Sequence, residues 1–343
     1  MSDESKNIPA SPRRRVTAQA VAERAGVSRS AVSRAFTEGA YLDQKKKARI
    51  LEVAAELGYR PNVFAASLQA ESSNIVAVLT GNMKSHFDAE LVEELLGRLT
   101  AAGKWPIVVS GEKVANAPSV EGLFGFPVDA MILRGGSMDK FVVEACAKLH
   151  IPLIISGVTI DLDTVDSVAC RNADGTYALT RLLLERGRRR FGWIDGPTRV
   201  VTQETYRRER RKGVIRALEE AGLELITSCD SDYTYEGGLK AAESILRDHD
   251  IDALMCANDA MAAGALSYVR ENLDLNVPDD LSLTGFDDVS MAAWPCFDLT
   301  TVRNPRTEIV DHILRLLHER LADPSKPGEV VLVGADLVPR GTH

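Results

Sequence analysis

Two arginines and several serines lie close together in the stretch AGVSRSAVSRAF, residues 25–36. Arg29 and Arg34 carry planar guanidinium groups that can donate two hydrogen bonds to a guanine edge, and Ser30 can pair with several bases. Three further hydroxyls are short donors suited to phosphate oxygens: Thr17, Ser28 and Ser33. These residue types indicate contact with double-stranded DNA, and the alternative for such a short match is a surface that binds another protein.

Helix boundary signals surround this stretch. Thr17 is a plausible N-cap for a helix that Gly26 ends, a second helix starts at Ser28, and a third runs from about Asp43 to Gly58. Two short helices joined by a tight glycine turn form a helix-turn-helix, whose second helix lies in the major groove. The remaining apolar side chains are expected to pack the helices together: Ala25, Val27, Val32 and Ala35.

Charge is unevenly distributed along the chain. The 343 residues carry a net charge of −8, but residues 1–70 hold 12 Lys and Arg against 7 Asp and Glu, and the remainder holds 29 against 42. A basic segment on an acidic chain indicates nucleic-acid contact by that segment alone. Residues 1–15 are predicted to be a disordered tail, either solvated or with its Arg13–Arg15 run on phosphate.

Several function classes lack support in the sequence. No H-E-x-x-H, G-x-S-x-G or phosphate-loop pattern occurs, which gives no sign of an enzyme, and neither a metal nor another cofactor is expected. The five cysteines are scattered singly and are expected to be reduced core residues. No run of about 20 apolar residues is present, and the N-terminus is polar, so we expect no membrane contact and a cytoplasmic location.

After Asn74, short apolar runs alternate with amphipathic helical stretches, which predicts parallel sheets covered by helices. The runs expected to be strands are IVAVLT, WPIVVS, DAMILRG, IPLIISG, RFGWIDG, LELITSC, IDALMCAND and LSLTGFDD. Ligands gather at the carboxyl ends of parallel strands. Four such ends carry small or polar residues and are where a pocket is expected: Asn82, Ser156, Asn258 and Asp287.

The order of motifs along nearly the whole chain resembles the LacI/GalR (lactose-repressor) family of bacterial transcription regulators. The similar segments are the stretch from Val16 to Asn62, the following AASL, the stretch from Arg210 to Leu218, CANDAMAAGAL, VPDDLSLTGFDD, LTTVRNP and DLVPRGT. The resemblance implies an all-α helix-turn-helix headpiece followed by an α/β periplasmic-binding-protein-like core of two Rossmann-like subdomains. It also implies a repressor that binds a palindromic operator as a homodimer and responds to a small effector, a sugar or sugar derivative.

The resemblance divides the chain into a tail at 1–15, a DNA-binding domain at 16–59, a hinge at 60–73 and an effector-binding and dimerisation core at 74–343. In the family the hinge becomes helical on DNA, and its leucine, here Leu68, wedges into the minor groove. An apolar wedge of this kind is a known way to bend DNA, although simple packing of Leu68 on the core is the alternative. Asn62 and Ala65 match hinge positions that face DNA.

The resemblance also places an effector site in the core. Arg210 matches an arginine that reaches into the pocket, Asn258 and Asp287 match hydrogen-bonding positions, and Tyr233 falls where the family has an aromatic ring. Phe87 and Asp88 open the first helix near the loop at Asn82. Such groups suit a sugar, but a helix cap or turn for the polar residues and a core position for the ring are the alternatives.

One position departs from the family pattern. Arg171 stands where relatives commonly carry aspartate. If Arg171 faces the pocket, the effector would be more acidic than a plain sugar; if it faces solvent, nothing changes. Two other functions share the expected fold, a transporter's solute-binding protein and a cytosolic enzyme. The basic headpiece and the polar N-terminus argue against the first, and the missing catalytic motifs argue against the second.

Overall fold

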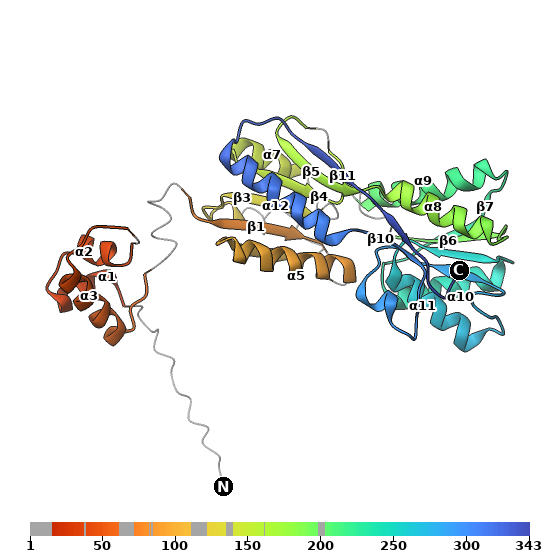
Figure 1. Cartoon of the computed structure of the whole chain (residues 1–343), viewed down its shortest axis with the longest axis horizontal. Coiled ribbons are helices and arrows are strands. Elements are labelled where there is room, and N and C mark those ends of the chain that lie inside the picture. The colour runs from red at the N-terminus through yellow and green to blue at the C-terminus, as the bar shows by residue number, and fades with distance from the viewer. Residues whose placement is uncertain are drawn as a thin grey trace, which may run out of the picture. The chain divides into compact units, whose positions relative to one another are not determined.

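The computed structural model describes residues 16–37, 39–61, 72–81, 83, 85–110, 122–134, 140–160, 162–197 and 203–343. Its contacts divide the chain into two units, Met1–Ser73 and Asn74–His343 (Figure 1). The predicted tail, the hinge residues Asn62, Ala65 and Leu68, and the loop residue Asn82 lie outside the described residues.

Three helices form the first unit: α1 Ala18–Ala25, α2 Arg29–Ala35 and α3 Gln44–Leu57. Each begins at the capping residue expected from the sequence, because side-chain oxygens of Thr17, Ser28 and Asp43 accept hydrogen bonds from the first-turn amides. Gly26 and Gly58, both at φ +68°, end α1 and α3 in the left-handed conformation. The helix boundaries predicted from the sequence are therefore confirmed.

The second unit contains two lobes. The six-stranded lobe has a parallel sheet in the order β11-β5-β4-β3-β1-β2. Its strands are β1 Ile75–Thr80, β2 Trp105–Ser110, β3 Ala130–Arg134, β4 Leu153–Ser156, β5 Val165–Cys170 and β11 Val330–Val333. Its helices are α5 His86–Ala101, α7 Lys140–Leu149 and α12 Arg306–Ala322.

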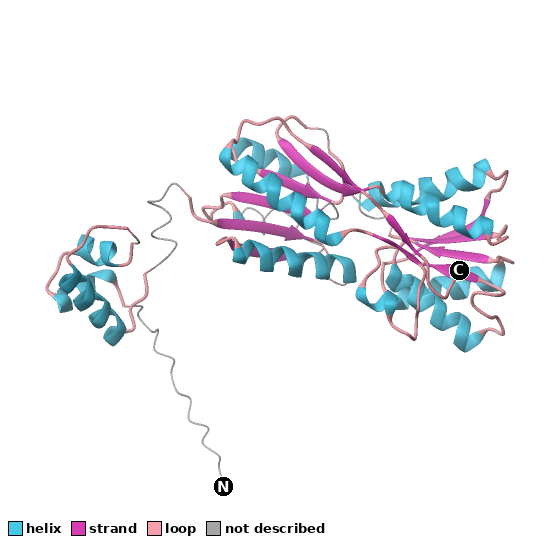
Figure 2. Ribbon diagram, viewed as in Figure 1, coloured by secondary structure: helices cyan, strands magenta, loops and turns pink. Residues whose placement is uncertain are grey.

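Helices cover this sheet on both faces (Figure 2). Successive side chains of β1 point to opposite faces of the sheet, so they pack against different helices. Val76 and Val78 pack in one cluster with α5 and α12, whereas Ala77 and Leu79 pack in another with α7. Because both faces are covered, β1 is buried along its whole length and reads as a continuous apolar run.

The four-stranded lobe has a second parallel sheet in the order β7-β6-β8-β9. Its strands are β6 Phe191–Asp195, β7 Leu225–Asp230, β8 Ala253–Cys256 and β9 Ser282–Thr284. Its helices are α8 Asn172–Glu185, α9 Gln203–Glu220, α10 Tyr235–Asp248, α11 Asp259–Asn272 and the 3-10 turn η2 Ser290–Ala293. A small antiparallel pair, β10 Thr301–Arg303 with β12 Asp336–Val338, lies beside α8.

The chain passes between the lobes at three places in the described ranges: from β5 to α8, from β10 to α12, and from β11 to β12. The predicted core of two Rossmann-like subdomains is confirmed, and the subdomains are interwoven because of these passages. The sequence did not single out β5, β10, β11 or β12 as strands.

The cysteines differ in their surroundings. Cys146, Cys170 and Cys256 are buried, and burial raises the pKa of the Cys146 thiol to about 12, which keeps it protonated and unreactive. Cys229 is half-buried and Cys296 is exposed. The expectation that all five lie in the core is therefore wrong for Cys296, which lies in the turn after η2.

Candidate functional site

The second helix of the three-helix unit has one buried and one polar face. Ala31, Val32 and Ala35 are buried in the small core that α1 and α3 share. The residues predicted to contact DNA are all exposed: Arg29, Ser30, Ser33 and Arg34. Packing by the apolar face thus fixes the helix while two guanidinium groups and two hydroxyls remain available on its outer side.

The two capping hydroxyls are partly engaged within the unit. Thr17 Oγ1 accepts from the Ala20 amide at 3.2 Å, and Ser28 Oγ accepts from the Ala31 amide at 3.2 Å and lies 2.9 Å from Ser30 Oγ. Capping uses an acceptor lone pair of each hydroxyl. A role on phosphate would therefore depend on the remaining O–H donor of Thr17 or Ser28.

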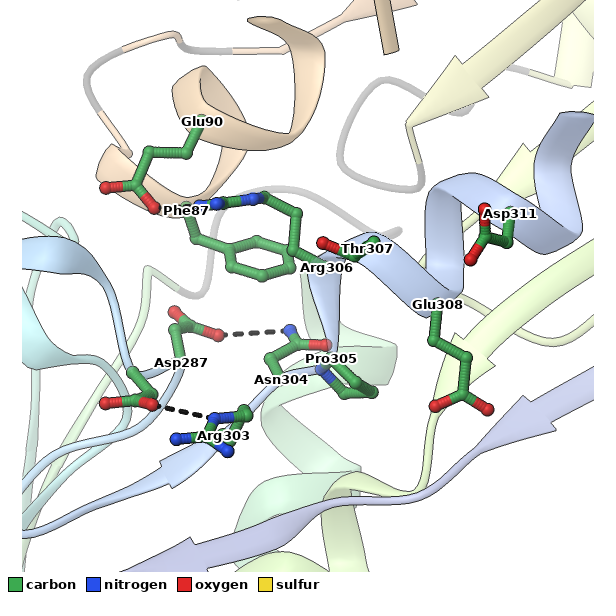
Figure 3. A pocket seen from close by; sticks show the side chains of 11 residues that line it. Phe87, Glu90, Asp287, Arg303, Asn304, Pro305, Arg306, Thr307, Glu308 and Asp311 are labelled. Atoms are coloured by element: carbon green, nitrogen blue, oxygen red, sulfur yellow. Dashed lines mark hydrogen bonds and ion pairs between the residues drawn. The ribbon is translucent and has the colours of Figure 1, made fainter. Parts of the chain in front are cut away.

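A cavity of about 460 Å³ lies between the two lobes. Figure 3 shows Phe87 and Arg306 on one side of it, with Asp287, Asn304 and Arg303 facing them. The lining residues are Phe87, Glu90, Asp287, Asp288, Arg303, Asn304, Pro305, Arg306, Thr307, Glu308 and Asp311. Its volume is in the range of small-molecule sites.

Arg210 lies beside the cavity-lining Asp287, and its side chain makes three hydrogen bonds. Its Nη2 donates to Asp287 Oδ1 at 2.8 Å, its Nε donates to Asn172 Oδ1 at 3.1 Å, and its Nη1 donates to the Ala257 carbonyl. The guanidinium also stacks 3.8 Å from the centre of the Phe286 ring. Arg210 is only 7% exposed. Its bond to Asp287 fixes the orientation of that carboxylate, which lines the cavity.

Close packing of α9 on α8 places Arg210. A Cβ on Gly213 would stand 2.1 Å from the Ala173 carbonyl oxygen, so only glycine permits this approach. Thr176 Oγ1 on α8 donates to the Arg210 carbonyl at 2.7 Å, which fixes the backbone of α9 at the arginine itself. Gly213, three residues after Arg210, is therefore part of what positions the site.

Asp287 is held in an unusual backbone conformation with φ +110°. Its amide donates to the Val302 carbonyl at 2.8 Å, and its Oδ1 also accepts from Asn304 Nδ2 at 3.2 Å. Burial raises the pKa of the Asp287 carboxyl, whereas the Arg210 guanidinium and the Asn304 amide oppose that rise.

A second polar cluster stands on the six-stranded lobe. Arg134, at the end of β3, donates through Nε to Asp88 Oδ1 at 3.0 Å and through Nη1 to Ser156 Oγ at 2.9 Å. Its guanidinium also lies 5.6 Å from the centre of the cavity-lining Phe87 ring. The structure thus joins three predicted residues, Phe87, Asp88 and Ser156, through an arginine that the sequence analysis missed. Its signal was a charged residue at the end of the apolar run DAMILRG.

Two other predicted site residues are committed to local structure. Asn258 Oδ1 caps α11 by accepting from the Met261 amide at 2.9 Å, and its Nδ2 donates to the Tyr233 carbonyl at 3.1 Å. The Tyr233 ring packs over Gly196, where a Cβ would stand 2.0 Å from the ring. Neither Asn258 nor Tyr233 is among the described residues that line the cavity.

Arg171 is exposed and is not among the residues that line the cavity. It occupies the N-cap position of α8 without a side-chain capping bond. Of the two alternatives that the sequence left open, the structure has Arg171 exposed to solvent.

Glu90 joins the two lobes beside the cavity. Its Oε1 accepts from the Ser290 hydroxyl at 2.7 Å and from the Ser290 amide at 3.2 Å, and its Oε2 pairs with Arg306. Ser290 belongs to η2 of the four-stranded lobe, whereas Glu90 lies on α5 of the other lobe. This carboxylate therefore fixes one lobe against the other.

Replacing Glu90 by alanine is expected to lower the free energy of unfolding by about 1–2 kcal/mol, because a charged acceptor of several hydrogen bonds is lost. Urea denaturation followed by circular dichroism measures this change. Glu93→Ala is the matched control, because Glu93 is an exposed residue of the same helix. Equal midpoints for the two variants would show that Glu90 does not join the lobes.

Within the described part of the chain, no group of three or more His, Cys, Asp or Glu residues is arranged to hold a metal ion. No helix in that part has both the length and the apolar character needed to cross a bilayer.

Comparison with protein families gives two matches. Residues 17–62 match the family described as bacterial regulatory proteins, lacI family, and residues 180–343 match the periplasmic binding protein-like domain. Among curated proteins, the chain is 27% identical over 308 residues to catabolite control protein A of Priestia megaterium. The aligned region covers 88% of this chain and 91% of that protein.

Two solved structures match the chain over nearly its whole length. The lac repressor dimer bound to operator and the anti-inducer ONPF matches with a TM-score of 0.82 and 25% identity, over 96% of this chain and 99% of that chain. A complex of the transcriptional regulator CelR with cellobiose matches with a TM-score of 0.70 and 26% identity, over 96% of this chain and 100% of that chain.

Proposed function

Because the chain belongs to the lacI family of bacterial regulatory proteins, we propose that it is a sequence-specific DNA-binding transcription regulator, and in particular a repressor. The observation that carries this proposal is α2, whose apolar face is buried while Arg29, Ser30, Ser33 and Arg34 are exposed. A helix so presented suits the major groove, with its N-terminal side chains at base edges.

The DNA-bound form is a homodimer on a palindromic operator, one three-helix unit on each half-site. The support is the similarity to the lac repressor, which was solved as a dimer bound to operator. Protein two-fold symmetry then requires a two-fold related DNA site.

The proposal divides the chain into four parts. Residues 1–15 are a tail, 16–59 bind DNA, 60–73 are the hinge, and 74–343 bind effector and dimerise. In the hinge, Asn62, Ala65 and Leu68 are proposed to face DNA.

A small effector controls DNA binding from the cavity between the lobes. Phe87 and Asp287 line it, and Arg210 holds the Asp287 carboxylate. Asn258 and Tyr233, which contact each other, stay candidates for effector contact. We take the effector to be a sugar or sugar derivative, in agreement with the cellobiose complex of the similar regulator CelR. Ligand binding would change the relative angle of the lobes, and with it the spacing of the two DNA-binding units.

The proposal includes neither a catalytic reaction nor a cofactor, and it places the protein in the cytoplasm, where its DNA target is found. The named relatives are regulators rather than enzymes, for example catabolite control protein A. The periplasmic binding protein-like domain also suits a transporter's solute-binding protein, but such a protein has no use for the helical unit that matches the regulators.

Selection of bound sequences from a random pool of DNA duplexes tests the function directly. We expect enrichment of one palindrome, bound at a fixed salt concentration about 10³-fold or more tightly than a scrambled duplex. Affinity that is the same for selected and scrambled duplexes would contradict a sequence-specific regulator.

A further inference from the structure

The 3-10 turn η2 brings side chains of the four-stranded lobe into contact with the six-stranded lobe. Val289, directly before η2, and Met291, within it, are buried in the same apolar cluster as Phe87 of α5. Ser290, between them, donates to Glu90 Oε1 through its hydroxyl at 2.7 Å and through its amide at 3.2 Å. One short turn therefore provides both apolar contacts and hydrogen bonds between the lobes.

A buried carboxylate fixes this turn to its own lobe. Asp259, the first residue of α11, is 1% exposed, and its Oδ2 accepts from the Val289 amide at 2.9 Å while its Oδ1 accepts from the Thr301 hydroxyl. The Asp259 amide donates to the Phe286 carbonyl at 2.9 Å. Breaking buried hydrogen bonds of this kind is costly, so η2 moves together with the four-stranded lobe.

Glu90 is fixed in the same way to the six-stranded lobe. Its Oε2 pairs with Arg306, the first residue of α12, and Arg306 Nε also donates to Glu94 Oε2 at 3.0 Å. The Glu90 carboxylate is thus held by its own lobe through one oxygen and contacts the other lobe through the second. Such a contact favours the arrangement of the lobes in which it forms over those in which it is broken.

We propose that the contact between Ser290 and Glu90 is a latch, which stabilises one arrangement of the lobes and so sets the operator affinity of the protein before any ligand binds. This inference rests on the proposed function, in which the lobe arrangement controls DNA binding. Ser290 is not among the described residues that line the cavity, and it lies in a different unit from α2. The latch therefore acts on DNA binding through the lobes alone.

Fluorescence anisotropy with the palindrome selected from the random DNA pool tests the latch in the full-length protein. Ser290→Ala removes the hydroxyl that donates to Glu90, and Glu90→Gln removes the charge of the acceptor. We expect each variant to change the operator dissociation constant about threefold or more, both in the same direction, because both destabilise the same lobe arrangement. The double variant should change it by less than the product of the two single changes, because both substitutions act on one contact.

Matched controls separate the latch from general effects of the substitutions. Ser244→Ala on α10 and Glu93→Gln on α5 replace exposed residues and should leave the dissociation constant within about twofold of the wild type. Sedimentation at the assay concentration checks that the variants remain dimers. Unchanged operator affinity in both latch variants, or a change that accompanies loss of the dimer, would overturn the proposal.

Thiol labelling gives a second readout that requires no DNA. Cys170 lies at the end of β5, where the chain passes to the other lobe, and its Sγ donates at 3.4 Å to the carbonyl of Gly334, which lies on the passage from β11 to β12. Cys146 is buried in the six-stranded lobe, on α7. Burial raises the pKa of both thiols to about 12, so their labelling rates differ mainly by access.

Labelling with iodoacetamide is followed at each cysteine by mass spectrometry of the peptides. In Ser290→Ala we expect Cys170 to react about threefold or more faster than in the wild type, with the rate at Cys146 unchanged, because only the passages between the lobes become more accessible. Equal acceleration at both cysteines would show loosening of the whole core, and no acceleration at Cys170 would show that the lobes keep their arrangement; either result would refute the latch. This readout remains decisive even if the wild type selects no palindrome, a result that would refute the proposed function.

Discussion

Replacing Arg210 by alanine is expected to lower the free energy of unfolding of the core by about 3–5 kcal/mol, because it leaves the buried Asp287 carboxylate without its cation. Asp287 is 7% exposed, and its remaining described hydrogen bond to the same oxygen comes from Asn304 at 3.2 Å. The carbonyl of Ala257 and the amide oxygen of Asn172 lose a donor as well. Chemical denaturation followed by tryptophan fluorescence measures the change.

Arg216→Ala is the matched control on the same helix. Arg216 is half exposed and pairs with Asp174 at 3.6 Å, so its loss should cost at most about 1 kcal/mol. We also expect the folded fraction of the Arg210→Ala variant to bind operator without responding to effector. Equal stability of the two variants, or a normal effector response in Arg210→Ala, would show that Arg210 does not organise the cavity wall.

Replacing Arg29 by alanine is expected to cost about 1–3 kcal/mol of affinity at one base pair of the operator, through loss of a bidentate contact to guanine. Arg29 is the first residue of α2 and is exposed, so the helix and its buried face should be unaffected. Fluorescence anisotropy on operator duplexes that differ at single base pairs measures the change and its position. Affinity for unrelated DNA should fall far less.

Arg24→Ala removes an exposed arginine from α1 of the same unit and serves as the control for general charge. It should weaken binding slightly and equally on all duplexes, because phosphate contacts carry no sequence information. If Arg29→Ala also lost affinity equally on operator and unrelated DNA, Arg29 would be a phosphate contact and not a reader of bases.

The three-helix unit was predictable from sequence because its signals are local. Thr17, Ser28 and Asp43 lie directly before their helices, and each cap is made with an amide three residues further on. Gly26 and Gly58 likewise end helices by their own backbone conformation. No contact between distant segments is needed to recognise these elements.

The cavity was less predictable because distant segments form it. Asn304 lies on the passage from β10 to α12, and Arg306 is the first residue of α12. The sequence did not single out β10 as a strand. The strand has three residues, too few for a visible alternation. Arg134 was missed for a related reason, since its contact with Asp88 spans 46 residues and depends on how β3 lies beside α5.

Residue type also does not reveal how a side chain is used. Asn258 was expected at a strand end, and it lies there, but its amide oxygen caps α11 and its nitrogen holds the Tyr233 carbonyl. Arg171 stands at another strand end and is exposed. The sequence located both positions but left their side-chain directions open, and the ligand chemistry depends on those directions.

The central claim is that a ligand in the cavity controls DNA binding, and a linked titration tests it most directly. The dissociation constant for the selected operator is measured by anisotropy at fixed salt, without ligand and then at a saturating concentration of a sugar that binds the protein. We predict a change of about fivefold or more, which corresponds to a coupling free energy of at least about 1 kcal/mol. A sugar that saturates the cavity while the operator dissociation constant stays the same would contradict the account.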